Sequence, residues 1–180
     1  MIKTKKSVAV FGVLASLYVM PGWAEQMKPF SLPGLKSGST ISSSASKGKV
    51  MIVDFWASWC EPCKASFAAY NELLNKYGKK GLVIVGINID NDKEKALEFI
   101  ENNPAHFLVA VDPTKKVAEA YNLPTMPTAY IIDRDGNILY THAGYHEGDL
   151  AEMEKEVENA LNQGKGASNQ NEAATEQEVN

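Results

Sequence analysis

The stretch Val53-Asp54-Phe55-Trp56-Ala57-Ser58-Trp59-Cys60-Glu61-Pro62-Cys63-Lys64 holds both cysteines of this 180-residue chain and determines the expected architecture. The apolar run 50–56 has the length of a buried strand, and apolar residues at helical spacing occupy 62–77. Cys60 therefore falls where a strand ends and a helix begins. Its sulfur can meet unpaired N–H groups and the positive end of the helix dipole, and both favour the thiolate that is the nucleophile in disulfide exchange.

Cys63 lies one helical turn after Cys60, so its sulfur can reach Cys60 and resolve a mixed disulfide. Pro62 is tolerated between them because N–H groups in the first turn have no helical partner. A permanent bond across so short a loop would stabilise the fold by only about 2 kcal/mol in the chain-entropy model. The spacing therefore indicates a bond that opens and closes.

Asp54 interrupts an otherwise apolar strand, where an unpaired buried carboxylate is costly. Two interpretations follow from the residues alone. Asp54 is either a hydrogen-bonded structural residue or a proton acceptor for Cys63 whose pKa is raised by burial.

Alternating elements are predicted on the C-terminal side of this stretch. Asn91 and Glu94 form a capping box, Asp112 and Pro113 open a helix, and Asp133-Arg134-Asp135-Gly136 forms a hairpin turn. This order predicts an α/β fold with a central mixed β-sheet flanked by helices. The expected strands span 50–56, 82–89, 107–111, 128–132 and 137–143; the expected helices span 62–77, 91–102 and 112–121, and a last helix carries Leu150, Met153, Val157 and Leu161.

The two ends of the chain differ from its centre in composition. Residues 1–24 combine lysines, an apolar run and small residues at Gly22 and Ala24, which predicts a signal peptide cleaved after Ala24. A membrane anchor is the alternative, but the run is shorter than the roughly 20 residues that span a bilayer. We expect one domain over 25–163, beginning with a short hairpin or an irregular cover, and a disordered polar tail over 164–180. The mature chain would be exported without stable membrane insertion, and periplasmic in a double-membrane bacterium.

Charge and cysteine content exclude several classes of protein. A net charge of -4 and a pI near 5.4 argue against a nucleic-acid binder. Two cysteines exclude a disulfide-dense miniprotein and a four-cysteine zinc site. His142 and His146 complete a set of two cysteines and two histidines, but about 80 residues separate the halves, against the short spacing of a zinc finger. We therefore expect no metal, and surface positions for both histidines.

The opening stretch resembles the active-site strand and helix of thioredoxins, and Pro124-Thr125-Met126-Pro127-Thr128 resembles their loop with a cis-proline. Over Phe30 to Leu161, with an extra helix and strand after the second core strand, the chain is most similar to TlpA/ResA-like exported thiol-disulfide oxidoreductases. The resemblance implies a thioredoxin-like fold, no bound cofactor, and exchange with protein dithiols and disulfides. It also implies a membrane thiol reductant as electron donor. Ser66 departs from the glutamate of ResA-like members, and Gly86 from the lysine of thioredoxins.

The resemblance also implies roles for individual residues. Cys60 and Cys63 form the redox-active disulfide. Asp54, six residues before Cys60, matches the thioredoxin acid, which favours its interpretation as a proton acceptor. Trp56 is expected in the core, and the substrate-facing residues are expected to be Trp59, Glu61, Pro62, Met126 and Pro127.

The direction of exchange follows from how weakly the Cys60 thiolate is stabilised. A helix N-terminus lowers the pKa of a thiol only modestly, and Glu61 opposes further lowering. A weakly stabilised reduced form is a reducing couple, so we expect a protein-disulfide reductase acting in redox homeostasis. The alternatives are a copper or zinc carrier using the same thiolates, and a non-catalytic partner-binding module.

Overall fold

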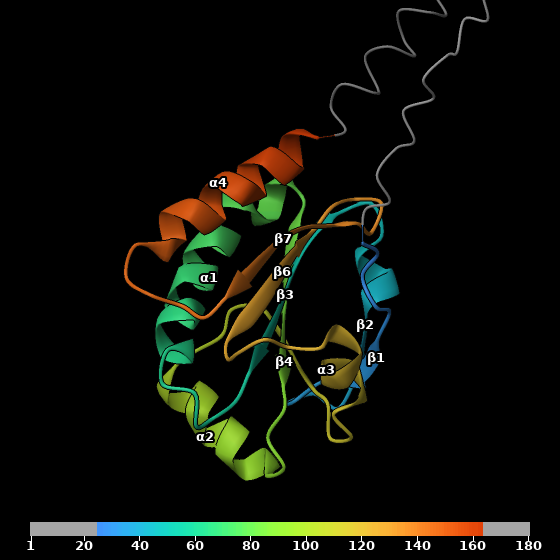
Figure 1. Cartoon of the computed structure of the whole chain (residues 1–180). Coiled ribbons are helices and arrows are strands. Elements are labelled where there is room, and N and C mark those ends of the chain that lie inside the picture. Colours follow the sequence, from blue (N-terminus) through green and yellow to red (C-terminus); the bar gives the residue numbers. More distant parts are fainter. Residues whose placement is uncertain (1–24, 164–180) are drawn as a thin grey trace, which may run out of the picture.

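A five-stranded mixed sheet forms the centre of the computed structural model, which describes residues 25–163 (Figure 1). Its strands, in spatial order, are β5 (Leu108–Val111), β4 (Leu82–Asn88), β3 (Val50–Trp56), β6 (Thr128–Ile132) and β7 (Ile138–Ala143). β3 runs parallel to β4 and antiparallel to β6, while β5 is parallel to β4 and β7 antiparallel to β6. The predicted mixed sheet is confirmed, and each strand agrees with its expected bounds to within one residue.

Helices cover both faces of the sheet (Figure 1). They are α1 (Cys63–Tyr77), α2 (Lys93–Asn102), α3 (Lys116–Tyr121) and α4 (Asp149–Asn162), with short 3-10 helices at η1 (Ser43–Ser46) and η2 (Gly78–Lys80). One core cluster contains residues of α1, α2 and α4, and the other contains residues of α3 and the N-terminal segment. We expected this segment to be either a short hairpin or an irregular cover. It forms a hairpin, in which β1 (Ser31–Pro33) is antiparallel to β2 (Thr40–Ser42).

The alternation of side chains along β3 decides which layer each residue joins. Ile52 and Trp56 belong to the cluster beneath α1, whereas Val53 and Phe55 belong to the cluster beneath α3. All seven residues of β3 are buried, as expected of a central strand covered on both faces. Asp54 lies between Val53 and Phe55, so its side chain shares the α1 face with Ile52 and Trp56.

An aromatic cluster fixes the α1 face of the sheet and explains Gly86. Trp56 contacts Phe67 and Phe99 with ring centroids 4.9 and 4.8 Å apart, and Phe107 lies 5.0 Å from Phe67. A Cβ atom at Gly86 would lie 3.1 Å from Phe107 and 3.2 Å from the Trp56 indole nitrogen. The two rings therefore occupy the space that a lysine would need at this position.

The starts of two helices differ slightly from the prediction. α1 begins at Cys63, and Pro62 precedes it as a capping residue that already has helical dihedral angles. α2 is capped by Asp92, whose carboxylate accepts from the Glu94 N–H at 3.0 Å, so the expected cap at Asn91 is wrong by one residue. Both aspartate and asparagine favour this position, which is why residue type alone does not separate them.

The start of α3 differs by more. The helix begins at Lys116, after Lys115 in a left-handed conformation, and not at Asp112. The Asp112 carboxylate nevertheless accepts from the Val117 and Ala118 N–H groups at 2.9 and 3.0 Å. It caps the helix across an intervening turn, which a rule based on sequence-adjacent caps does not anticipate.

The expected signal peptide (1–24) and polar tail (164–180) lie outside the described residues. Within 25–163, no helix combines the length and apolar character needed to cross a bilayer.

We predict that Gly86→Ala destabilises the protein, by about 1–3 kcal/mol, because the added methyl group overpacks the space beside Phe107 and Trp56. Urea unfolding of the variant, with and without Phe107→Leu, measures this cost. The cost should fall in the Phe107→Leu background, where the side chain that crowds the site is smaller. An equal cost in both backgrounds would show that crowding at Phe107 is not the reason for glycine.

Candidate active site

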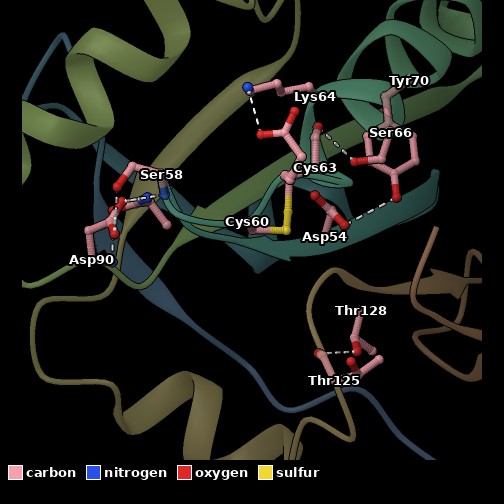
Figure 2. Close-up of a disulfide and its surroundings, with 12 residues drawn as sticks. Asp54, Ser58, Cys60, Cys63, Lys64, Ser66, Tyr70, Asp90, Thr125 and Thr128 are labelled. Carbon is pink, nitrogen blue, oxygen red and sulfur yellow. Dashed lines mark hydrogen bonds and ion pairs between the residues drawn. A yellow bond between two sulfur atoms is a disulfide. The ribbon is translucent and has the colours of Figure 1, made fainter.

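The two cysteines form a disulfide between the end of β3 and the start of α1 (Figure 2). Their Cα atoms are 5.4 Å apart. The Cys63 N–H donates to the Cys60 carbonyl at 3.2 Å, and the Cys60 N–H donates to the Ala57 carbonyl at 3.1 Å. Cys60 retains 3% exposure and Cys63 none. The tight turn therefore leaves Cys60 as the more accessible of the two residues.

Asp54 is fully buried on the α1 face of β3. Its Oδ1 accepts from the Tyr70 hydroxyl at 3.1 Å, while its Oδ2 has no hydrogen-bond partner among the described residues. Figure 2 shows the Asp54 carboxyl between the disulfide and Tyr70. Burial raises the pKa of Asp54 well above its usual value, and the hydrogen bond from Tyr70 offsets only part of that effect. The carboxyl can therefore bind a proton at a higher pH than an exposed aspartate.

Two buried hydroxyl groups of α1 belong to the site and were missed by sequence reasoning. Ser66 donates to the Cys63 carbonyl at 3.1 Å, and Tyr70 donates to Asp54. Both are fully buried. They follow Cys63 by three and seven residues, which places all three on one helix face. This spacing is the sequence feature that could have placed Ser66 and Tyr70 in the site. A tyrosine within an apolar stripe, however, is interpreted first as a core residue.

Asp90 fixes the loop that leads from β3 to Cys60. Its carboxylate accepts from the Ser58 N–H at 2.8 Å, from the Ser58 hydroxyl at 3.0 Å and from the Asn88 side-chain amide at 2.8 Å. This set of contacts ties the loop after β3 to the end of β4. Sequence reasoning missed Asp90 as well. The parallel strands β3 and β4 end at the same edge of the sheet. A polar residue soon after β4 is therefore the sequence feature that could have placed Asp90 near the Cys60 loop.

The residues around the disulfide present a mixed surface. Trp59 is 66% exposed, as expected for a rim residue, whereas Trp56 is buried as predicted. Glu61 is exposed and forms an ion pair with Lys64 at 2.7 Å. An exposed pair of this kind contributes little stability. However, it places a compensating cation beside the acid that we expected to act on Cys60.

The second predicted loop lies at the start of β6, next to the end of β3. Thr128 is paired with Phe55 in the sheet, so the residues just before it lie near the Cys60 loop. The Met126-Pro127 peptide bond is cis, as predicted. Pro127 is buried, its carbonyl accepts from the Gly144 N–H at 2.8 Å, and Met126 is half-buried. Figure 2 marks this loop by Thr125 and Thr128.

The expectation that both histidines lie at the surface is wrong for His142. Its ring is buried, with Nε2 2.9 Å from the Asp149 carboxylate, because the alternation of β7 turns this residue toward the start of α4. His146 is exposed. Within residues 25–163, no group of three or more His, Cys, Asp or Glu side chains is arranged to hold a metal ion.

Comparisons with known proteins agree on the family. The Redoxin family model matches residues 24–161. The thiol-disulfide oxidoreductase ResA of Bacillus cereus is 32% identical over 102 residues, or 57% of this chain and 59% of the relative. ResA of Bacillus subtilis is 30% identical over 108 residues, or 60% of each chain. The chain thus spans about three-fifths of the length of these curated relatives.

Solved structures extend the likeness over most of the domain. A putative thiol:disulfide interchange protein DsbE from Chlorobium tepidum aligns with a TM-score of 0.74 and 38% identity, covering 77% of this chain and 96% of that one. StoA from Bacillus subtilis aligns with a TM-score of 0.60 and 23% identity, covering 72% and 96%, and supports the fold alone. The chain therefore belongs to the redoxin family, as a thioredoxin-fold protein of the TlpA/ResA-like type.

Proposed function

We propose that this protein is a thiol-disulfide oxidoreductase that reduces disulfides of other proteins through Cys60 and Cys63. The observation that carries the proposal is the disulfide at the start of α1, with the buried carboxyl of Asp54 on the strand face beneath it. Relatives at about 30% identity are named thiol-disulfide oxidoreductase ResA, which supports the assignment of thiol-disulfide exchange to this chain.

The exchange has two steps that balance in atoms and electrons. In the reduced protein, the Cys60 thiolate attacks a substrate disulfide; one substrate sulfur leaves as a thiolate, and the other stays bound to Cys60. Cys63 then gives its proton to Asp54 and attacks the Cys60 sulfur, which releases the second substrate thiolate. Both released thiolates take up protons. The substrate has gained two electrons, and the protein is left with the Cys60–Cys63 disulfide.

The geometry supports the division of roles between the two thiols. Cys60 precedes the helix and is 3% exposed whereas Cys63 is not exposed at all, so we assign the attack on an incoming disulfide to Cys60. Cys63 is fully buried and lies on the helix face that carries Tyr70, the hydrogen-bond partner of Asp54. A buried thiol needs a nearby acceptor for its proton because the neutral form is favoured away from water.

The surface around Cys60 supports binding of an extended peptide. Trp59, which precedes Cys60 in the chain, is exposed, and the loop at Met126 and Pro127 enters β6 beside the end of β3. In our proposal, substrate segments pack on Trp59 and lie against this loop. Glu61 and Pro62 form the rest of the rim.

We further propose that the protein works outside the cytoplasm and is recharged by a membrane thiol reductant. Signal-like features of residues 1–24 support export. Lys64, the cation that follows Cys63 in the chain, is paired with Glu61. It is therefore not free to stabilise the Cys60 thiolate. A weakly stabilised thiolate favours the reductive direction, and a reductase in an oxidising compartment needs an electron donor.

Trapping tests the proposed function. Cys63→Ser should accumulate a mixed disulfide with substrate proteins, because Cys60 can attack but the bond cannot be resolved. Cys60→Ser is the matched control and should trap far less. Non-reducing electrophoresis followed by mass spectrometry identifies the attached chains. Equal trapping by both variants, or trapping by Cys60→Ser alone, would reject the assigned roles.

Asp54→Asn tests the buried proton acceptor by two readouts. Mixed-disulfide resolution should slow by about 10²–10⁴-fold, the usual contribution of general acid–base catalysis. The raised pKa of Asp54 means that its ionisation costs folding stability once the pH exceeds the unfolded-state value of about 3.9. The variant should therefore be more stable than the wild type at pH 8 and lose that advantage as the pH falls toward 4.

Urea unfolding at several pH values and stopped-flow exchange kinetics measure these two effects. An Asp54→Asn variant with wild-type kinetics would remove Asp54 from the mechanism. A pH-independent stability difference would mean that the fold does not raise the pKa of Asp54 above its unfolded-state value.

A further inference from the structure

Tyr70 is a buried polar side chain that the proposed exchange steps do not use. It lies on α1, fully buried, and its ring packs edge-on against Phe107 with centroids 6.0 Å apart. Its hydroxyl donates to Asp54 Oδ1 at 3.1 Å (Figure 2). A phenylalanine would fill the same space, so packing alone does not require the hydroxyl group.

The surroundings of Asp54 make this hydrogen bond the main polar contact of the carboxyl. Its partners across the sheet are Gly86 on β4 and Ala129 on β6, neither of which carries a polar side chain. From α1, Tyr70 contacts the carboxyl through its hydroxyl, and Figure 2 shows the disulfide of Cys63 on the other side of the carboxyl. Within residues 25–163, Tyr70 is the only side chain that forms a hydrogen bond with Asp54, and no lysine, arginine or histidine forms an ion pair with it.

We propose that Tyr70 is a positioning residue for thiol-disulfide exchange, holding Asp54 by Oδ1 so that the free Oδ2 takes the proton of Cys63. This inference rests on the proposed function. It gives the two carboxylate oxygens different tasks, one fixed by the helix and one left for the reaction. The phenol itself gives up no proton.

Burial keeps the phenol in its donor form. Burial and the charge of Asp54 both raise the pKa of Tyr70 well above its usual value, so the hydroxyl stays protonated at every pH used for exchange. Tyr145 is a further titratable group that acts on Tyr70, in the same direction. A permanent donor favours the ionised form of Asp54 and so opposes the effect of burial on its pKa.

The sign of the effect on the reaction follows directly. Resolution needs ionised Asp54, so its rate rises as the pH passes through the pKa of Asp54. Removing the phenol hydroxyl takes away a contact that favours the carboxylate, which raises that pKa further. The rise in rate should then occur at higher pH, and the rate on the high-pH plateau should also fall because Oδ1 is no longer held.

Tyr70→Phe tests the proposal, with Tyr77→Phe as the matched control. Tyr77 is a buried tyrosine on the same helix, but its hydroxyl donates to Glu154 and Glu158 on α4 and not to the site. The readout is the pH dependence of resolution of a mixed disulfide between Cys60 and a model peptide. Tyr70→Phe should move the midpoint up by about one to two pH units, the size expected of a hydrogen bond to a charged group. Tyr77→Phe should leave it in place.

Each outcome bears on one claim. An unmoved midpoint in Tyr70→Phe, or an equal shift in Tyr77→Phe, overturns the positioning role while wild-type exchange still supports the proposed function. A wild-type protein that exchanges no disulfide rejects the proposed function itself. Should Tyr70→Phe fail to fold, 3,5-difluorotyrosine at position 70 keeps the ring and strengthens the donor. The midpoint should then move to lower pH, and an unchanged midpoint would overturn the proposal.

Discussion

The arrangement of the site depends on one buried carboxyl that has a hydrogen-bond donor on only one of its oxygens. Asp54 lies in the central strand with Tyr70 on Oδ1 and no partner for Oδ2 among the described residues. An ionised carboxylate in such a place is costly, so the fold must gain stability elsewhere. The aromatic packing of Trp56 with Phe67 and Phe99 on the same face holds α1 against the sheet and keeps the carboxyl away from water.

Three segments distant in sequence meet at the end of β3 and give the disulfide its position. The Cys60 loop is held by Asp90 at the end of β4, and the cis-proline loop enters β6 beside it. α1 carries Cys63 and the tyrosine that binds Asp54. Because the sheet fixes the ends of its strands, these contacts do not depend on the exposed rim at Trp59. The buried half of the site is held by packing, and the exposed half is where we propose that substrates bind.

Much of this site could be predicted because its chemistry depends on short spacings. The cysteine pair and the strand before it follow from local patterns, whereas the cis bond at Pro127 follows from the resemblance of its loop to that of thioredoxins. What could not be predicted depends on contacts between distant residues. Tyr70 looks apolar in a helical stripe until the fold places Asp54 beneath it, and Asp90 looks like a turn residue until Ser58 is seen against it. His142 was misplaced for the same reason, since its partner lies on another element.

The equilibrium between the oxidised and reduced forms of Cys60 and Cys63 tests the central claim most directly. The purified protein would be equilibrated in redox buffers of known potential at about pH 7, and its free thiols counted by alkylation and mass spectrometry. A reversible two-electron transition far below the roughly -120 mV of a strong oxidant, toward the ~-270 mV of thioredoxin, is the predicted result. A transition near about -120 mV, or a disulfide that never equilibrates with the buffer, would contradict a reductase built on this pair.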